Sequence, residues 1–246
     1  MTRVVSYSRP AWALAAAAAL LYLSGCGLPA PGRAAPDHRL VVVLLDETGS
    51  FVDYWQPCLD LAASVASRLK PGDAFAVIGI DDHGNDPEDA RIPVTLVSPG
   101  ALQSLADRKS LAKKVKALEP RKAKRPLTDI LHAMQQASIF ANAPAMQGYK
   151  PVVLFFSDMQ ETPRLPGPAD IKGWSFAARG EAYCFYVNVT GWVDHAKTQH
   201  GTTWDSLVES WTATLNAAGL DADPKKSFFQ SGDSKVEISR LFPAGF

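Results

Sequence analysis

The most constraining feature of this sequence is a run of six consecutive leucine and valine residues at positions 40–45, followed directly by Asp46. A continuous apolar run rich in β-branched residues is typical of a strand buried on both faces, and such strands occur in parallel sheets. A second all-apolar run at 152–156 ends at Ser157-Asp158. Each run therefore predicts a central strand with polar residues at its carboxyl end.

Helical periodicity alternates with these strands. Apolar residues recur every three to four positions from Trp55 to Leu69, and Pro71-Gly72 stops the pattern. The same criteria predict strands at 75–80, 92–97 and 183–189, helices around 111–118, 130–141 and 204–215, and an edge strand or packing tail at 236–242. This alternation predicts an α/β fold with a doubly wound, mostly parallel sheet flanked by helices.

The first 25 residues belong to targeting rather than to the fold. Arg3 and Arg9 precede an apolar stretch at 11–23, which is too short and too alanine-rich to predict a membrane span. The stretch ends in Leu23-Ser24-Gly25-Cys26 and resembles the lipobox of bacterial lipoproteins. That resemblance implies a signal peptide at 1–25 and a lipid on Cys26. An ordinary signal peptide with a chance cysteine is the alternative.

The segment after Cys26 is rich in proline, glycine and alanine and is typical of a tether. We therefore expect a lipidated cysteine with its tether at 26–38 and a single domain at 39–246. The lipobox resemblance implies anchoring to the bacterial cell membrane or the outer membrane, facing the periplasm or the exterior.

Composition excludes two broad classes of protein. The 25 basic and 25 acidic residues balance, which argues against a general nucleic-acid binder, and 47% hydrophobic residues argue against disorder as the main state. One stretch, 108–125, is strongly basic. It is either a surface that attracts an acidic partner or anionic lipid, or simply a solvated helix face and loop.

Two cysteines remain once Cys26 is assigned to lipid. Cys58 and Cys184 form a disulfide, which an oxidising compartment permits, or serve as two small buried apolar residues. The second interpretation is slightly favoured.

Hydroxyl and carboxylate residues gather where the predicted strands end. In a doubly wound sheet, ligands bind beyond the carboxyl ends of the strands, where the strands ending at 45 and 156 are expected to be neighbours. An oxygen-only set with few carboxylates suits Mg²⁺ or Mn²⁺, with Ca²⁺ also possible. The alternative is that these residues are only helix caps and turn formers. The predicted metal ligands are Asp46, Thr48, Ser50, Thr128 and Asp158.

At these residues the sequence resembles the von Willebrand factor A domain. That family carries a metal-ion-dependent adhesion site written D-x-S-x-S, then a distant T, then a distant D. The resemblance implies metal binding, a protein partner that supplies an acidic residue to the metal, and no enzymatic activity. Two departures are Thr48, which keeps a hydroxyl, and Met159, where the family often has glycine. The matching residues are Asp46-Glu47-Thr48-Gly49-Ser50, Thr128 and Asp158.

Two other functions remain open. The Asp46-Glu47-Thr48-Gly49-Ser50 segment also resembles the aspartyl-phosphate loop of the haloacid dehalogenase superfamily, which would make Asp46 the nucleophile of a Mg²⁺-dependent phosphotransfer enzyme. Asp158 and Glu161 would then imitate that family's acidic pair, although Thr48 lacks the carboxylate common in its phosphatases. A structural envelope protein with a vestigial metal site is the third hypothesis.

Overall fold

The computed structural model describes residues 38–80, 90–120, 128–159, 164–187, 203–230 and 232–243, apart from the side chains of residues 49, 50 and 52. Cys26, the signal peptide and nearly all of the tether lie outside these residues. The elements are β1 (Arg39–Asp46), the 3-10 helix η1 (Gly49–Tyr54), α2 (Trp55–Ser67), β2 (Ala74–Ile80), β3 (Ile92–Leu96), α3 (Ala101–Lys116), α4 (Ile130–Asn142), η3 (Pro144–Met146), β4 (Lys150–Phe156), η4 (Pro168–Asp170), β5 (Gly180–Phe185), α6 (Trp204–Ala217), β6 (Leu220–Asp221) and α7 (Ser234–Leu241).

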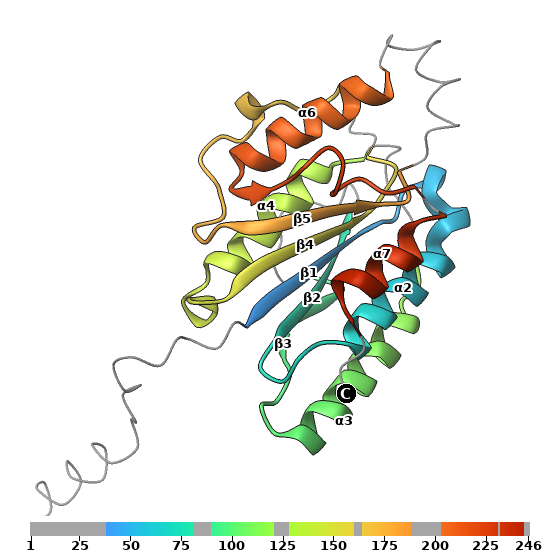
Figure 1. Ribbon diagram of the computed structural model, residues 1–246, viewed down its shortest axis with the longest axis vertical. Coiled ribbons are helices and arrows are strands. Elements are labelled where there is room, and N and C mark those ends of the chain that lie inside the picture. Colours follow the sequence, from blue (N-terminus) through green and yellow to red (C-terminus); the bar gives the residue numbers. More distant parts are fainter. Residues whose placement is uncertain are drawn as a thin grey trace, which may run out of the picture. The chain divides into compact units, whose positions relative to one another are not determined.

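Six strands form one sheet in the order β3-β2-β1-β4-β5-β6 (Figure 1). All neighbouring strands are parallel except β2 and β3, which are antiparallel. The two strands with continuous apolar sequences, β1 and β4, lie side by side at the centre. The predicted α/β fold class is therefore confirmed.

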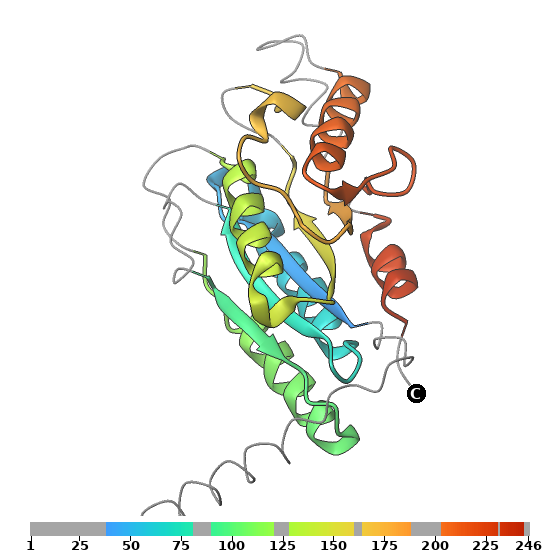
Figure 2. The same ribbon diagram turned by 90° about the vertical axis from the view of Figure 1, so that its left-hand side faces the viewer.

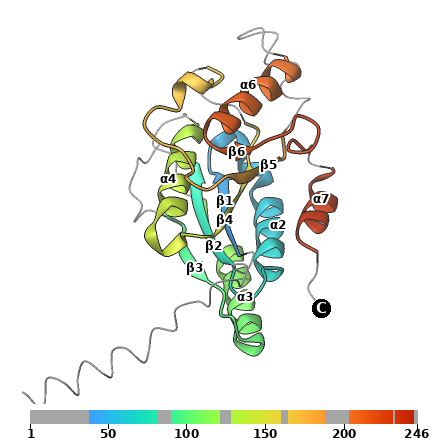
Figure 3. The ribbon, with the colours of Figure 1, turned by 60° about the vertical axis from the view of Figure 1, so that its left-hand side comes forward.

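Helices cover both faces of the sheet. α4 crosses one face (Figure 2), and in the edge-on view it lies on the opposite side of the sheet from α2 and α7 (Figure 3). The β1 side chains alternate between two hydrophobic clusters, one per face, as the period of a strand requires. Val41, Val43 and Leu45 pack in the cluster with α2, whereas Leu40, Val42 and Leu44 pack in the cluster with α4.

Both clusters, and every hydrogen-bonded strand pair, lie within residues 37–246, which form one compact unit. A chain of these residues contains its own complete core. In the part of the chain that the structure describes, no helix is both long enough and apolar enough to traverse a bilayer.

Four elements differ from the sequence-based expectations. The strand expected at 183–189 is β5, which runs from Gly180 to Phe185, and the two-residue strand β6 was not expected. The helix expected at 111–118 begins at Ala101, because its first turns bury little besides Ser104 and so carry no apolar period. Residues 236–242 form no edge strand. Residues 236–241 belong to α7, a helix that buries Ser234 and Ile238, four residues apart, on one face. Ile238 and Phe242 pack in a hydrophobic cluster, so the alternative of a packing tail is confirmed.

Cys58 and Cys184, the cysteines among the described residues, are free and buried. Cys58, on α2, packs in one hydrophobic cluster, and Cys184, on β5, packs in the other, so the sheet lies between them. The disulfide alternative is therefore wrong, and the two residues serve as small apolar side chains.

Candidate functional site

The carboxyl ends of β1 and β4 bring two polar residues together. Leu45 of β1 pairs with Phe156 of β4, so the residues that follow, Asp46 and Ser157, are neighbours across the two strands. By the alternation of a strand, Asp46 shares the face of Leu44, which is the face that α4 covers. The local sequence thus directs a carboxylate to the carboxyl end of β1, beside the carboxyl end of β4.

Hydroxyl groups hold the Asp46 carboxylate on both sides. Oδ1 accepts hydrogen bonds from the Thr48 amide at 2.9 Å and the Thr48 hydroxyl at 2.6 Å, and Oδ2 accepts one from the Ser157 hydroxyl at 2.7 Å. Asp46 is only 1% exposed. Burial raises the pKa of Asp46, and the hydrogen bonds from Thr48 and Ser157 oppose that increase. The site thus places a buried carboxylate among neutral donors.

Thr128 and Asp158 are also buried, each at 8% exposure. Asp158 directly follows Ser157, and Thr128 lies two residues before the first residue of α4. The N-cap of α4 is Asp129, whose side chain accepts a hydrogen bond from the His132 amide at 2.9 Å. The interpretation of Thr128 as the cap of this helix is therefore wrong.

The structure joins some of the predicted ligands more directly than others. Hydrogen bonds link Asp46 with Thr48, and Asp158 adjoins Ser157, which bonds to Asp46. Thr128 lies at the start of the helix on that face. Ser50 lies in η1, and its side chain is outside the described residues. We refer to Asp46, Thr48, Ser157 and Asp158 as the edge site.

The donors of the edge site fit a hard divalent cation. They are two carboxylates and two hydroxyls, and oxygen is the ligand that Mg²⁺ and Mn²⁺ prefer. Among the described residues, no group of three or more histidine, cysteine, aspartate or glutamate side chains is placed to hold a metal ion. A cation here would therefore rely on hydroxyls, and the buried charge of Asp46 would stabilise it.

The residue after Asp158 has an unusual backbone. Met159 has a φ of 62°, in the left-handed region that favours glycine. Its amide donates to the Ser157 hydroxyl at 3.0 Å, and its carbonyl accepts from the Trp211 indole at 2.9 Å. The departure from glycine is thus accommodated, because α6 holds the strained residue and the buried Met159 side chain packs in the core. Trp211 is itself fully buried in the same hydrophobic cluster as Met159.

A buried ion pair that the sequence did not predict lies beside the edge site. The Arg91 guanidinium donates from Nη1 to both carboxylate oxygens of Glu47, at 2.6 and 2.5 Å, and from Nη2 to the Glu119 carbonyl beyond α3. The Glu47 side chain is fully buried and that of Arg91 is 10% exposed. A Cβ at Gly79 would lie 2.4 Å from Glu47 Oε1, so the glycine makes room for this carboxylate.

The Glu47 pair connects several strand ends. The Glu47 amide donates to the Ile80 carbonyl at the end of β2, and Arg91 directly precedes β3. Glu47 lies between Asp46 and Thr48 in sequence. The ion pair therefore fixes the backbone from which the edge site projects. The signal for it was a second consecutive acidic residue after a buried strand, but no local pattern identifies a partner 44 positions away.

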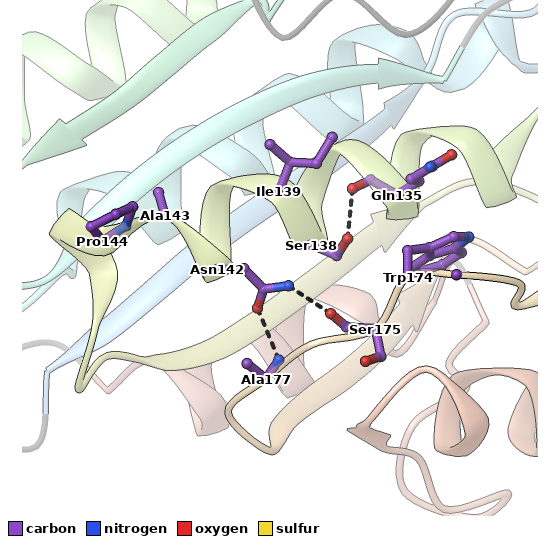
Figure 4. Close-up of a pocket in the computed structure, with 10 residues that line it drawn as sticks. Gln135, Ser138, Ile139, Asn142, Ala143, Pro144, Trp174, Ser175 and Ala177 are labelled. Atoms are coloured by element: carbon purple, nitrogen blue, oxygen red, sulfur yellow. Dashed lines mark hydrogen bonds between the residues drawn. The ribbon is translucent and has the colours of Figure 1, made fainter.

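A separate hollow of about 950 Å³ lies on the α4 face (Figure 4). It runs between the carboxyl half of α4 and the segment 173–177, where Asn142 donates to the Ser175 carbonyl and accepts from the Ala177 amide. Since α4 starts at Ile130, two residues after Thr128, and the hollow adjoins its carboxyl half, the hollow is at the other end of the helix from Thr128. Its lining contains none of the predicted ligands.

No family model and no curated protein sequence matches this chain. Among solved structures, it is similar to proximal thread matrix protein 1 from the mussel byssus, with a TM-score of 0.51 and 12% sequence identity over 84% of this chain and 48% of that chain. This chain thus spans about half the length of that protein. At this identity the likeness shows the fold alone.

Two further similar structures score lower. One is a von Willebrand factor type A protein from Catenulispora acidiphila, with a TM-score of 0.45 and 15% identity over 85% of this chain and 43% of that chain. The other is the manganese-loaded TRAP protein of Plasmodium vivax, with a TM-score of 0.44 and 13% identity over 85% of this chain and 74% of that chain. Nothing about this chain's function follows from these two similarities.

Proposed function

We propose that this chain is a lipid-anchored bacterial envelope protein whose von Willebrand factor A-type domain binds a divalent metal ion and, through it, a protein partner. The observation that carries the proposal is the buried Asp46 carboxylate, held by the hydroxyls of Thr48 and Ser157 at the carboxyl edge of the sheet. Ligands of doubly wound sheets bind at this edge.

Asp46, Thr48, Thr128 and Asp158 would hold Mg²⁺ or Mn²⁺, with Ca²⁺ a possible third ion and Ser50 a further ligand. The bound ion would supply a positive charge that accepts a carboxylate from the partner. Mg²⁺ prefers about six oxygen ligands, so four or five side chains would leave a coordination position that a carboxylate of the partner could fill. The chain's own part is to keep its oxygens oriented and shielded from solvent.

The geometry argues against the phosphotransfer alternative. A nucleophilic aspartate needs an oxygen accessible to substrate, whereas Asp46 is 1% exposed and both of its oxygens accept hydrogen bonds. We therefore propose a binding function without catalysis.

Anchoring through Cys26 is the second part of the proposal. It rests on the Leu23-Ser24-Gly25-Cys26 sequence and predicts a protein held at the cell membrane or the outer membrane, facing the periplasm or the exterior. Mass spectrometry of the protein expressed in a bacterium should find an N-terminal diacylglyceryl cysteine at position 26. A processed chain without lipid would contradict this part alone.

The metal is tested by titrating residues 37–246 with Mg²⁺ and Mn²⁺ while thermal unfolding is followed. We expect stabilisation that Asp46→Ala and Asp158→Ala abolish and that the exposed-acid control Asp53→Ala retains. Calorimetry should give one ion per chain. Catalysis is tested by incubating the same protein with a phosphate-ester substrate. Turnover that requires Asp46 would establish the phosphotransfer enzyme instead of the binding function. A folded protein whose stability does not respond to metal would support the structural envelope protein.

A further inference from the structure

The outer face of α3 differs from every other described helix surface in combining exposed leucines with lysines. Leu102 is 88% and Leu105 44% exposed, which are large values for leucine. Lys109, Lys113 and Lys116 are exposed as well. Their positions advance by three or four residues, so all five side chains lie along one line of the helix. We call this line the outer stripe: Leu102, Leu105, Lys109, Lys113 and Lys116.

The outer stripe lies opposite the face by which α3 packs on the domain. That inner face buries Ser104, Leu111 and Val115. Since the inner face alone supplies the packing, neither leucine of the outer stripe contributes to the described core. Leu102 and Leu105 can therefore be buried against an apolar surface outside the domain, which is favourable, without any loss of packing in the core.

The leucines are at the end of the sheet where β1 begins. Leu96, at the end of β3, pairs with Ala74, and Ala74 pairs with Leu40 near the start of β1. Leu96 is itself 55% exposed, and α3 begins five residues later. The exposed leucines thus gather at the amino end of the sheet, from which a lipid on the N-terminal segment would hold the domain.

The charge of the helix complements an anionic surface. α3 carries five basic residues and one acidic residue, Asp107, which accepts hydrogen bonds from the Ser98 amide and the Gln103 side chain. Lys116 lies 3.1 Å from Asp60, an exposed pair on which water and salt compete. Exposed apolar side chains that can enter the headgroup layer, with lysines nearby that attract anionic headgroups, are two features that together favour binding to the surface of an anionic bilayer.

We propose that α3 is a second, peripheral membrane contact, in which Leu102 and Leu105 enter the headgroup layer of an anionic bilayer while Lys109 and Lys113 bind lipid phosphates. A protein groove would need a matching shape, whereas two leucines projecting from a convex helix need only a soft apolar layer. The inference goes beyond the proposed metal function and rests on the proposed anchor only for the direction from which the membrane approaches.

The test is sedimentation of residues 37–246 with phosphatidylcholine vesicles, with and without phosphatidylglycerol. This chain lacks Cys26, so binding cannot come from the lipid anchor. We expect binding to the anionic vesicles that high salt weakens, and an affinity at least about tenfold lower in Lys109→Glu/Lys113→Glu. Leu102→Ser/Leu105→Ser should also bind more weakly, even at low salt.

Matched controls lie elsewhere on the surface. Lys225→Glu/Lys226→Glu removes the same charge from the turn after β6, and Val236→Ser removes an apolar side chain that is 67% exposed on α7. Both variants should bind anionic vesicles as the unmodified chain does. Asp46→Ala in the presence of EDTA should also bind the vesicles, and this result would show that vesicle binding does not depend on the metal site. Equal binding by all variants, or capture by immobilised polyglutamate without vesicle binding, would overturn the proposal; the latter would assign the stripe to an acidic protein.

Discussion

Both ends of β1 contain a buried pair of one arginine and one carboxylate, but the two ends use it differently. At the amino end, Arg39 pairs with Asp73, whose carboxylate also accepts hydrogen bonds from the Arg39 and Lys70 amides. At the carboxyl end, two carboxylates follow each other, and Arg91 pairs with Glu47 while hydroxyls hold Asp46. The first end neutralises its buried charge and closes a turn. At the second end, no arginine among the described residues pairs with the buried carboxylate of Asp46. A cation site requires such a carboxylate.

The largest contrast should come from removing the arginines. Arg91→Met leaves the fully buried Glu47 carboxylate without its cation and should cost about 3 kcal/mol of unfolding free energy. Arg39→Met should cost less, about 1–2 kcal/mol, because two backbone amides still hold Asp73. Urea denaturation of the metal-free chains measures both. Only Arg91→Met should also weaken Mn²⁺ binding, and equal metal affinities in the two variants would refute a role for the Glu47 pair in positioning the edge site.

Neutralising the aspartates should change stability in opposite directions. Burial raises the pKa of Asp46, so its ionised form is unfavourable without metal, and Asp46→Asn should stabilise the metal-free chain by about 1 kcal/mol. Asp73→Asn places an amide among donors and should destabilise it by about 1–3 kcal/mol. Thermal unfolding in EDTA measures the signs. Two losses of stability would mean that the edge site needs its charge for folding.

Two glycines permit a finer comparison. A Cβ at Gly79 would meet the Glu47 carboxylate, whereas one at Gly72, where φ is +87°, would meet the His38 ring at 2.2 Å. Gly72→Ala should cost more stability, about 1–2 kcal/mol, because its backbone is strained for any other residue. Gly79→Ala should cost less but lower Mn²⁺ affinity severalfold by displacing Glu47. The Mn²⁺ affinity of both variants is measured by calorimetry. A larger loss of Mn²⁺ affinity in Gly72→Ala than in Gly79→Ala would contradict a cation site at the carboxyl end of β1.

The smallest effect concerns the two faces of the sheet rather than its ends. Burial raises the thiol pKa of Cys58 and Cys184 well above the usual value, and the Asp46 charge adds to the increase at Cys58. Neither thiol should react with a disulfide reagent at pH 8 in folded residues 37–246, and both should react in denaturant. Rapid labelling of either thiol in the folded chain would contradict its burial.

The sequence predicted the fold well because its central strands are unambiguous. Two continuous apolar runs can hardly occupy anything but the middle of a parallel sheet, and their ends located Asp46, Thr48 and Asp158. Ser157 was within reach too: aligning the ends of the two runs places it beside Asp46. Segments with weaker hydrophobic periodicity were harder to assign. The helix α7 was not predicted because a segment of eight residues with few buried positions has a sequence pattern that fits a strand as well as a helix.

The remaining features depend on contacts between distant residues. Arg91 reaches Glu47 across 44 positions, and the left-handed backbone of Met159 is held by Trp211 from 52 positions away. A pattern within one segment carries no information on such pairs. The sequence also left open whether Thr128 caps the helix, because Thr128 and Asp129 are both good caps and only the geometry shows that Asp129 is the cap.

The two outer strands of the sheet offer few backbone groups for pairing with another copy of the chain. Pro93 interrupts the outer strand β3 with a residue that has no N–H, and Ser227 and Phe229 bond to Cys184 along the outer side of β5 beyond the short β6. Strands from another molecule therefore find little backbone to pair with at either edge. On the proposed lipid anchor, copies of this chain would diffuse in two dimensions and collide more often than free copies do. Sheet edges of this kind would limit strand pairing between the colliding copies.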